Sequence, residues 1–162
     1  MKRISATLLV LTISIGAFSQ EIIKKNELFL ELGGNGLLGS VNYERQLSNK
    51  PGLGVWAGLG LYGTDTHLTI PVGLSYLIPV IKNHSFLDLG FGATYTKTDG
   101  DFYSLVKRPE NYIPKKEFIY FIPSAGLRAY TTKNYVWRVN AQWFITESGG
   151  LPFIGIGFGK RF

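Results

Sequence analysis

Two histidines and no cysteine limit the catalytic chemistry available to this 162-residue chain. His67 follows Asp65 closely, and a later connecting segment holds Glu147 and Ser148. A serine, a histidine and an acidic group can act as nucleophile, base and orienting group when they lie within hydrogen-bond reach. His84 occurs in a short polar turn and is interpreted as a solvated residue. Whether the other four residues meet depends on the elements that carry them.

Two further patterns resemble ligand sites. Asp99 and Asp101 flank Gly100 and offer carboxylate oxygens in a turn, as a Ca²⁺ site requires, but the other ligands of a calcium loop are missing. The Gly-Gly-Asn-Gly sequence at residues 33–36 lacks the Lys-Ser or Lys-Thr that follows in a phosphate-binding loop. No zinc motif occurs. We therefore expect no metal and no cofactor.

From Glu27 onward, apolar and polar residues alternate in eight segments separated by turn signals, and such alternation indicates β-strands. In the last segment, Ile154, Ile156, Phe158 and Phe162 share one face and glycines occupy the other. The predicted strands are 27–33, 39–47, 53–62, 67–78, 86–96, 118–130, 135–145 and 151–162. Proline inside a strand removes a ladder hydrogen bond, so we expect a bulge or local distortion at Pro71 and at Pro123.

The composition of the polar faces decides which side of the strands meets water. A soluble barrel would carry many Lys and Glu residues on its polar face, whereas here that face is mostly Gly, Ser, Thr, Asn, Gln and aromatic residues. This composition indicates a crowded interior and an apolar face turned to lipid. The predicted fold class is all-β, an eight-stranded antiparallel transmembrane up-and-down β-barrel.

A few charged residues of both signs lie on the predicted inner face. Eight strands enclose only enough space for side chains, so these groups must pair or meet trapped water rather than line a wide channel. Shifting residues 135–145 by one position would turn inner arginine into lipid, at a cost of about 2–4 kcal/mol, so the register is strongly favoured. The predicted lumen network consists of Glu31, Glu44, Asp88, Arg128, Arg138 and Arg161.

The first 19 residues have the features of a secretory signal peptide. A basic start, Met1-Lys2-Arg3, precedes an interrupted apolar stretch, and small residues precede Gln20. The alternative is a retained anchor, but the stretch is shorter than the roughly 20 apolar residues that span a bilayer. We expect a signal peptide at 1–19, a short periplasmic lead at 20–26 and a barrel at 27–162. The basic residues are scattered, so we expect no nucleic-acid partner.

Connection lengths predict the orientation. An even strand count puts both termini on the periplasmic side, together with the short turns at 48–52, 79–84 and 131–134. The long connection at residues 97–117 then faces outward. Its aromatic and aliphatic residues either fold onto the barrel mouth or form a surface for a partner, a sugar or a lipid headgroup.

Residues 27–162 resemble the small eight-stranded outer-membrane β-barrel family, similar to the transmembrane domain of OmpA-type proteins and to stand-alone outer-membrane β-barrel domain proteins. Phe158 and the terminal Phe162 resemble the carboxyl-terminal signal that such proteins present to the barrel assembly machinery. Residues 41–45 resemble the second strand of some stand-alone members. Lys160 departs from the pattern, because an apolar residue is usual there. The resemblance implies the outer membrane as location but no single function.

These observations favour a non-enzymatic, monomeric outer-membrane protein with a structural or interaction role, in contact with membrane lipids and displaying residues 97–117 to a possible extracellular ligand. Two alternatives stay open. One is a narrow channel or a binder of small hydrophobic molecules. The other is a lipid-modifying enzyme at the rim that uses His67, Asp65 and Ser148.

Overall fold

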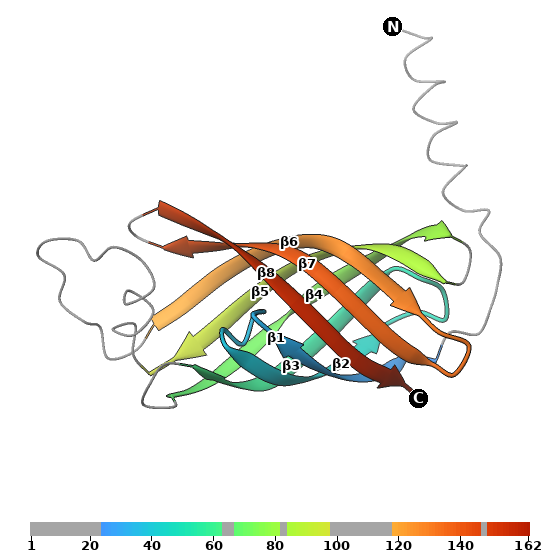
Figure 1. Ribbon diagram of the computed structural model, residues 1–162, viewed down its shortest axis with the longest axis horizontal. Coiled ribbons are helices and arrows are strands. Elements are labelled where there is room, and N and C mark those ends of the chain that lie inside the picture. Colours follow the sequence, from blue (N-terminus) through green and yellow to red (C-terminus); the bar gives the residue numbers. More distant parts are fainter. Residues whose placement is uncertain (1–23, 63–66, 82–83, 98–117, 147–148) are drawn as a thin grey trace, which may run out of the picture.

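A computed structural model describes the chain at residues 24–62, 67–81, 84–97, 118–146 and 149–162. Within these ranges the chain forms eight strands that close into one barrel, and each strand pairs antiparallel with its sequence neighbours (Figure 1). The predicted all-β, eight-stranded antiparallel barrel is confirmed. The strands are β1 (Asn26–Leu32), β2 (Gly39–Gln46), β3 (Leu53–Tyr62), β4 (His67–Ile81), β5 (Ser85–Thr96), β6 (Phe118–Tyr130), β7 (Tyr135–Thr146) and β8 (Gly149–Arg161).

The barrel closes between its first and last strands. β1 pairs with β8 from Glu27 opposite Arg161 to Leu32 opposite Ile156, and Asn26 exchanges two backbone hydrogen bonds with Phe162. The start of β1 and the end of β8 therefore lie at one end of the barrel, here called the termini end. The connection at residues 33–38 lies at the opposite end, here called the loop end.

Strand ends agree with the prediction to within two residues, except in β4. That strand continues to Ile81 rather than ending at Ile78. Its pairing with β5 shifts register between Pro79 and Ile81, so the chain passes the proline by a bulge and stays in the sheet. The turn predicted at residues 79–84 is correspondingly shorter.

Pro71 and Pro123, the two prolines at which the sequence predicts a distortion, interrupt a ladder without shifting its register. Beside Pro71 the β3–β4 ladder is interrupted between the pairs Ala57–Val72 and Gly60–Thr69. Beside Pro123 the β6–β7 ladder is interrupted between the pairs Phe121–Ile145 and Ser124–Gln142. The local distortion is confirmed and a bulge is not found at either position. Each proline keeps a partner on its other neighbouring strand, which holds the register.

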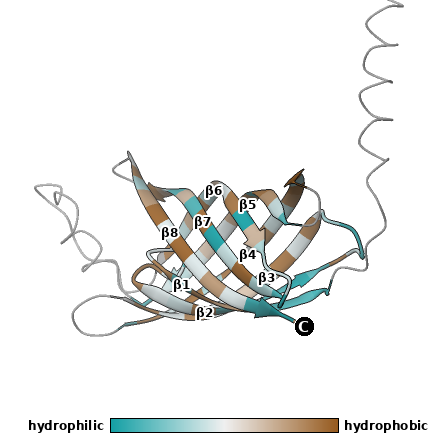
Figure 2. Ribbon diagram, turned by 45° about the vertical axis from the view of Figure 1, so that its right-hand side comes forward, coloured by the Kyte–Doolittle hydropathy of each residue, from teal (hydrophilic) through white to brown (hydrophobic). Residues whose placement is uncertain are grey.

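The two faces of each strand differ as the alternation predicted. On β7, Trp137 and Val139 are exposed on the outer face, while Val136, Arg138 and Asn140 are buried inside. Figure 2 shows hydrophobic and hydrophilic bands alternating along the strands. The described part of the chain has no helix long and apolar enough to cross a membrane.

Candidate functional site

The centre of the lumen holds a cluster of charged side chains around Arg128. Its guanidinium donates to both carboxylate oxygens of Glu44, at 2.6 and 2.9 Å, and to Oδ2 of Asp88, at 2.7 and 2.9 Å. Arg128 has no exposed surface. Arg128 lies on β6, Glu44 lies on β2 and Asp88 lies on β5. These charge-assisted bonds therefore join three strands inside the lumen.

Arg138 on β7 binds the same two carboxylates. Its Nη1 lies 2.9 Å from Glu44 Oε2, and its Nη2 lies 3.0 Å from Asp88 Oδ2. The guanidinium also lies over the ring of Phe29, 4.2 Å from the ring centroid. A low-dielectric interior makes these bonds strong, and it makes an unpaired charge there costly.

Glu27 is a member of this cluster that the sequence analysis did not assign to the lumen. Its Oε2 accepts from the Tyr130 hydroxyl at 3.0 Å and lies 3.4 Å from Arg128 Nη1. The signal was available, because Glu27 shares its side of β1 with Phe29 and Glu31. Few strand residues precede Glu27, so the alternating pattern around it is short. This makes its assignment to the inner face weaker.

Two of the six predicted network residues lie away from the centre. Glu31 is buried nearer the loop end, where it accepts hydrogen bonds from the Asn35 backbone N–H at 3.1 Å and from Gln142 Nε2 at 3.3 Å. Arg161 lies half-buried near the termini end, with its guanidinium 3.6 Å from the Tyr130 ring centroid. The structure thus brings Glu44, Asp88, Arg128 and Arg138 together. Glu31 lies on the loop-end side of this cluster, and Arg161 lies on the termini-end side.

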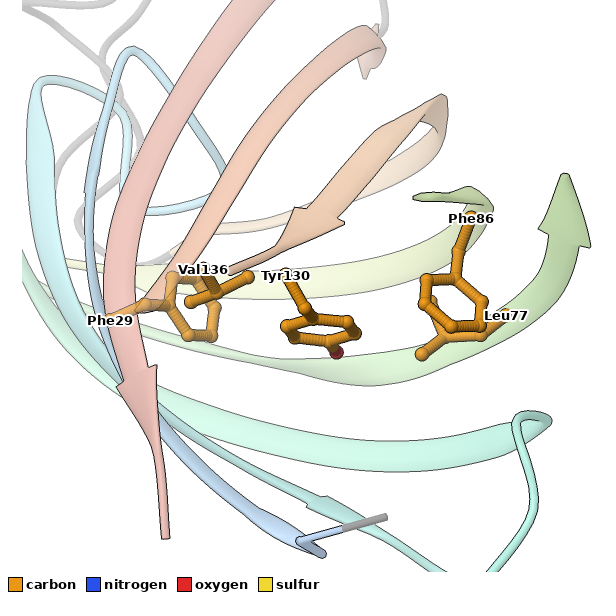
Figure 3. Close-up of a cluster of buried hydrophobic side chains, with 5 residues drawn as sticks. All are labelled: Phe29, Leu77, Phe86, Tyr130 and Val136. Carbon is orange, nitrogen blue, oxygen red and sulfur yellow. The ribbon is translucent and has the colours of Figure 1, made fainter. Parts of the chain in front are cut away.

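An apolar layer fills the lumen next to the charged cluster, toward the termini end. Its rings and aliphatic groups come from strands around the barrel, and Figure 3 shows them grouped across the interior. Phe86 and Tyr130 pack edge to face with ring centroids 5.4 Å apart. The layer consists of Phe29, Leu77, Phe86, Tyr130 and Val136.

At the loop end, the connection at residues 33–38 folds into the barrel. Thr94 Oγ1 on β5 donates to the carbonyl of Asn35 at 2.6 Å, and Thr69 Oγ1 on β4 donates to the carbonyl of Gly36 at 3.1 Å. We call this connection the plug. The sequence analysis predicted only a chain reversal here, and the structure adds that the reversal is buried in the lumen.

The plug ends in an apolar contact that requires an unusual backbone. Leu37 has φ of 75° and yet is only 6% exposed, because its side chain packs with Tyr120, Ile122 and Phe144. A left-handed conformation costs a non-glycine residue about 1–2 kcal/mol. The burial of the leucine side chain offsets this strain.

Glycines on the inner face make room for the plug. A Cβ at Gly92 would meet Asn35 Oδ1, and a Cβ at Gly60 would meet the carbonyl oxygen of Gly36. Alternation along β3 and β5 puts these glycines on the inner face but indicates no partner for them. Their role follows from the fold of a segment far away in the sequence.

Several predicted features lie outside the described residues. These are Asp65, Glu147 and Ser148 of the rim constellation, the Asp99–Asp101 pair, the signal peptide at 1–19 and nearly all of the connection at 97–117. His67 is described and lies half-buried at the start of β4. Among the described residues, no group of three or more His, Cys, Asp or Glu side chains could hold a metal ion.

The closed antiparallel barrel, its apolar outer face and its packed polar lumen together define the class of the protein as a transmembrane β-barrel of eight strands. No family model and no curated protein matches the sequence.

Solved outer-membrane barrels share this fold. The N-terminal β-barrel domain of Pseudomonas aeruginosa OprF is similar with a TM-score of 0.57 and 13% identity, over 85% of this chain and 96% of that one. The Yersinia pestis outer-membrane protein Ail in a phospholipid bilayer nanodisc gives a TM-score of 0.54 and 14% identity, over 86% and 100% of the two chains. At these identities the likeness concerns the fold alone.

Proposed function

We propose that the protein is an integral protein of the bacterial outer membrane whose closed barrel serves as a structural or interaction platform. The observation that carries this proposal is the filling of the lumen by three successive groups of buried side chains. These are the apolar layer at the termini end, the charged cluster at the centre and the plug at the loop end. Such an interior favours rigidity over passage of solutes.

The proposal includes an orientation. The connections from β2 to β3, from β4 to β5 and from β6 to β7 are short and join strand ends that lie at the termini end. The longest connection, residues 97–117, joins the ends of β5 and β6 that lie at the loop end. Outer-membrane barrels have short periplasmic turns and longer extracellular loops. Both termini are therefore periplasmic in this proposal, and residues 97–117 are the part offered to an extracellular ligand.

Planar-bilayer recording of the purified, folded protein tests the closed lumen. The proposal predicts no unit conductance steps from protein whose gel mobility shifts on heating, as a folded barrel requires. Steady conductance steps would instead support the narrow-channel alternative. Their preference for cations or anions should then change when the charge of Glu44 or Asp88 is removed. Absence of a heat-dependent mobility shift would count against the barrel itself.

A groove on the outer wall favours a second candidate function, the binding of a small hydrophobic molecule. It has a volume of about 900 Å³ and lies beside the interrupted β6–β7 ladder, where Pro123, Ala141 and Trp143 line it. Energy transfer from Trp143 to a fluorescent fatty acid should saturate and disappear in Ala141→Leu if this candidate holds. Unsaturable transfer, unchanged in the variant, would indicate simple partitioning into lipid.

The proposal assigns no catalysis to the rim. An enzyme that uses His67 would alter the lipids around it, so comparison of membrane lipids from cells that express the unaltered protein and His67→Ala tests this point. The proposal predicts identical lipid profiles.

A further inference from the structure

The described charges are divided between the inside and the outside of the barrel. All four described acidic side chains, Glu27, Glu31, Glu44 and Asp88, are buried in the lumen. Arg128 and Arg138 are buried there with them, whereas other basic side chains are exposed at and around the termini end. These are Lys24, Arg45, Lys50, Lys133 and Lys160. The outer surface at this end therefore presents cations that have no described acidic side chain beside them.

One of these cations borders an apolar groove on the outer wall. The groove has a volume of about 470 Å³ and lies on the outer wall over the paired strands β1 and β8. Lys160 on β8 stands directly between Leu28 of β1 and Tyr135 of β7 in the sheet register. Further apolar walls come from Leu30, Phe158 and Phe162.

Lys160 differs in chemistry from the other residues on its face of β8. The other side chains on its face of β8 are apolar, and an exposed ammonium in contact with hydrocarbon is unfavourable unless it reaches polar surroundings. Its Nζ lies 5.6 Å from the Tyr135 ring centroid, which orients it at the rim of the groove. Figure 2 shows the C-terminal tip of β8 in hydrophilic colour beside apolar segments of the same strand.

A ligand that fits this arrangement has an anionic group at one end and hydrocarbon at the other. Phosphate matches the ammonium of Lys160, and an acyl chain matches Leu28, Leu30 and Phe158. A lipid whose headgroup also carries a cationic amine fits less well, because the exposed basic side chains at the termini end repel that amine. Charge complementarity thus selects an anionic glycerophospholipid over a zwitterionic one.

We propose that the outer-wall groove over β1 and β8 binds one anionic glycerophospholipid, with its phosphate on Lys160 and one acyl chain along the groove. This site rests on the proposed function, because the lipid is available only if the barrel spans a bilayer. It adds to that function a specific lipid partner at the termini end.

Tryptophan quenching by lipids with brominated chains tests the site. Trp137 is a suitable reporter because its ring centroid lies 4.6 Å from that of Phe158, which lines the groove. Trp143 is exposed and is replaced by Phe in all variants, while Trp56 is buried in the lumen and gives a constant background. The protein is reconstituted into mixed phosphatidylglycerol and phosphatidylcholine vesicles in which one lipid or the other is brominated.

The expected result is a relative association constant of about five in favour of phosphatidylglycerol, since one basic side chain at an anionic membrane surface contributes an effect of about that size. Lys160→Gln should reduce this preference to near one, and Lys160→Arg should retain it. Lys97→Gln, which removes an exposed cation from the loop end, is the matched control and should leave the preference unchanged.

Each contrary outcome has a distinct meaning. Absence of quenching by either brominated lipid would contradict the membrane location and with it the proposed function. Equal quenching by both lipids in the protein that carries only Trp143→Phe would overturn the lipid site alone. A full preference in folded Lys160→Gln would also overturn it, because the phosphate would then bind elsewhere.

Discussion

Arg128 and Arg138 lie directly opposite each other on β6 and β7, and both guanidinium groups bind the same two carboxylates, Glu44 and Asp88. Like charges at directly opposed positions of a sheet repel each other. Here the carboxylates of Glu44 on β2 and Asp88 on β5 each bind both guanidinium groups, which offsets the repulsion between the two cations. The arrangement ties four strands together at the middle of the barrel.

Glu44→Gln should destabilise the barrel by about 3–5 kcal/mol, because it leaves the two buried guanidinium groups with only Asp88 and the more distant carboxylate of Glu27. The free energy of unfolding can be measured by tryptophan fluorescence in urea with the protein in lipid vesicles. Lys97→Gln is the control, since an exposed side chain outside the cluster should change stability by no more than about 0.5 kcal/mol. A Glu44→Gln effect as small as that of the control would show that the cluster does not hold the strands together.

Gly92→Ala should destabilise the protein by about 1–3 kcal/mol, because the added Cβ would meet the Asn35 amide of the plug. Gly52→Ala is a matched control at the termini end, where the nearest atom to a new Cβ is Tyr76 Cε2 at 4.0 Å. The temperature at which gel mobility shifts reports both variants. Equal temperatures for the two alanine variants would place the plug outside the lumen.

Leu37 allows backbone strain to be separated from burial. Leu37→Ala should lose about 2–5 kcal/mol through lost contacts with Tyr120, Ile122 and Phe144. Leu37→Gly loses the same contacts but relieves the left-handed backbone, so it should be about 1 kcal/mol more stable than the alanine variant. Unfolding titrations of both variants give the comparison. The reverse order of stability would contradict the conformation of the plug.

The sequence predicted the barrel well, because alternation is a local property that each strand carries by itself. The inner placement of Arg128 and Arg138 follows from that alternation alone. The plug could not be predicted in this way. Whether residues 33–38 fold inward depends on space left by Gly60 and Gly92, and on hydroxyls of Thr69 and Thr94, all from other strands.

The extension of β4 was missed for a different reason. The predicted turn at residues 79–84 begins at Pro79, so the predicted strand ends before this proline. The structure accommodates it by a register shift, and pairing resumes at Ile81 opposite Ser85. A single sequence does not distinguish a proline that ends a strand from one that sits at a bulge.

Removal of the terminal aromatic ring tests the predicted assembly signal. Phe162 is 57% exposed on the outer wall, so Phe162→Ala should leave the stability of the folded barrel within about 1 kcal/mol. The amount of the Phe162→Ala variant in the outer membrane of expressing cells should nevertheless fall several-fold, if the barrel assembly machinery recognises Phe162. The matched control is Leu32→Ala, an exposed residue on β1. Equal amounts of the two variants would separate Phe162 from assembly.

Site-directed spin labelling across β7 tests most directly whether lipid surrounds the outer wall and the lumen is packed. Since the chain has no cysteine, single cysteines at Val139, Asn140 and Ala141 can each carry a nitroxide in vesicles. Labels at 139 and 141 should collide readily with oxygen dissolved in the bilayer and poorly with a water-soluble nickel reagent, whereas the label at 140 should be immobilised and reached by neither. Free access of the nickel reagent to 139 and 141, or a mobile label at 140, would contradict a lipid-facing wall around a filled lumen.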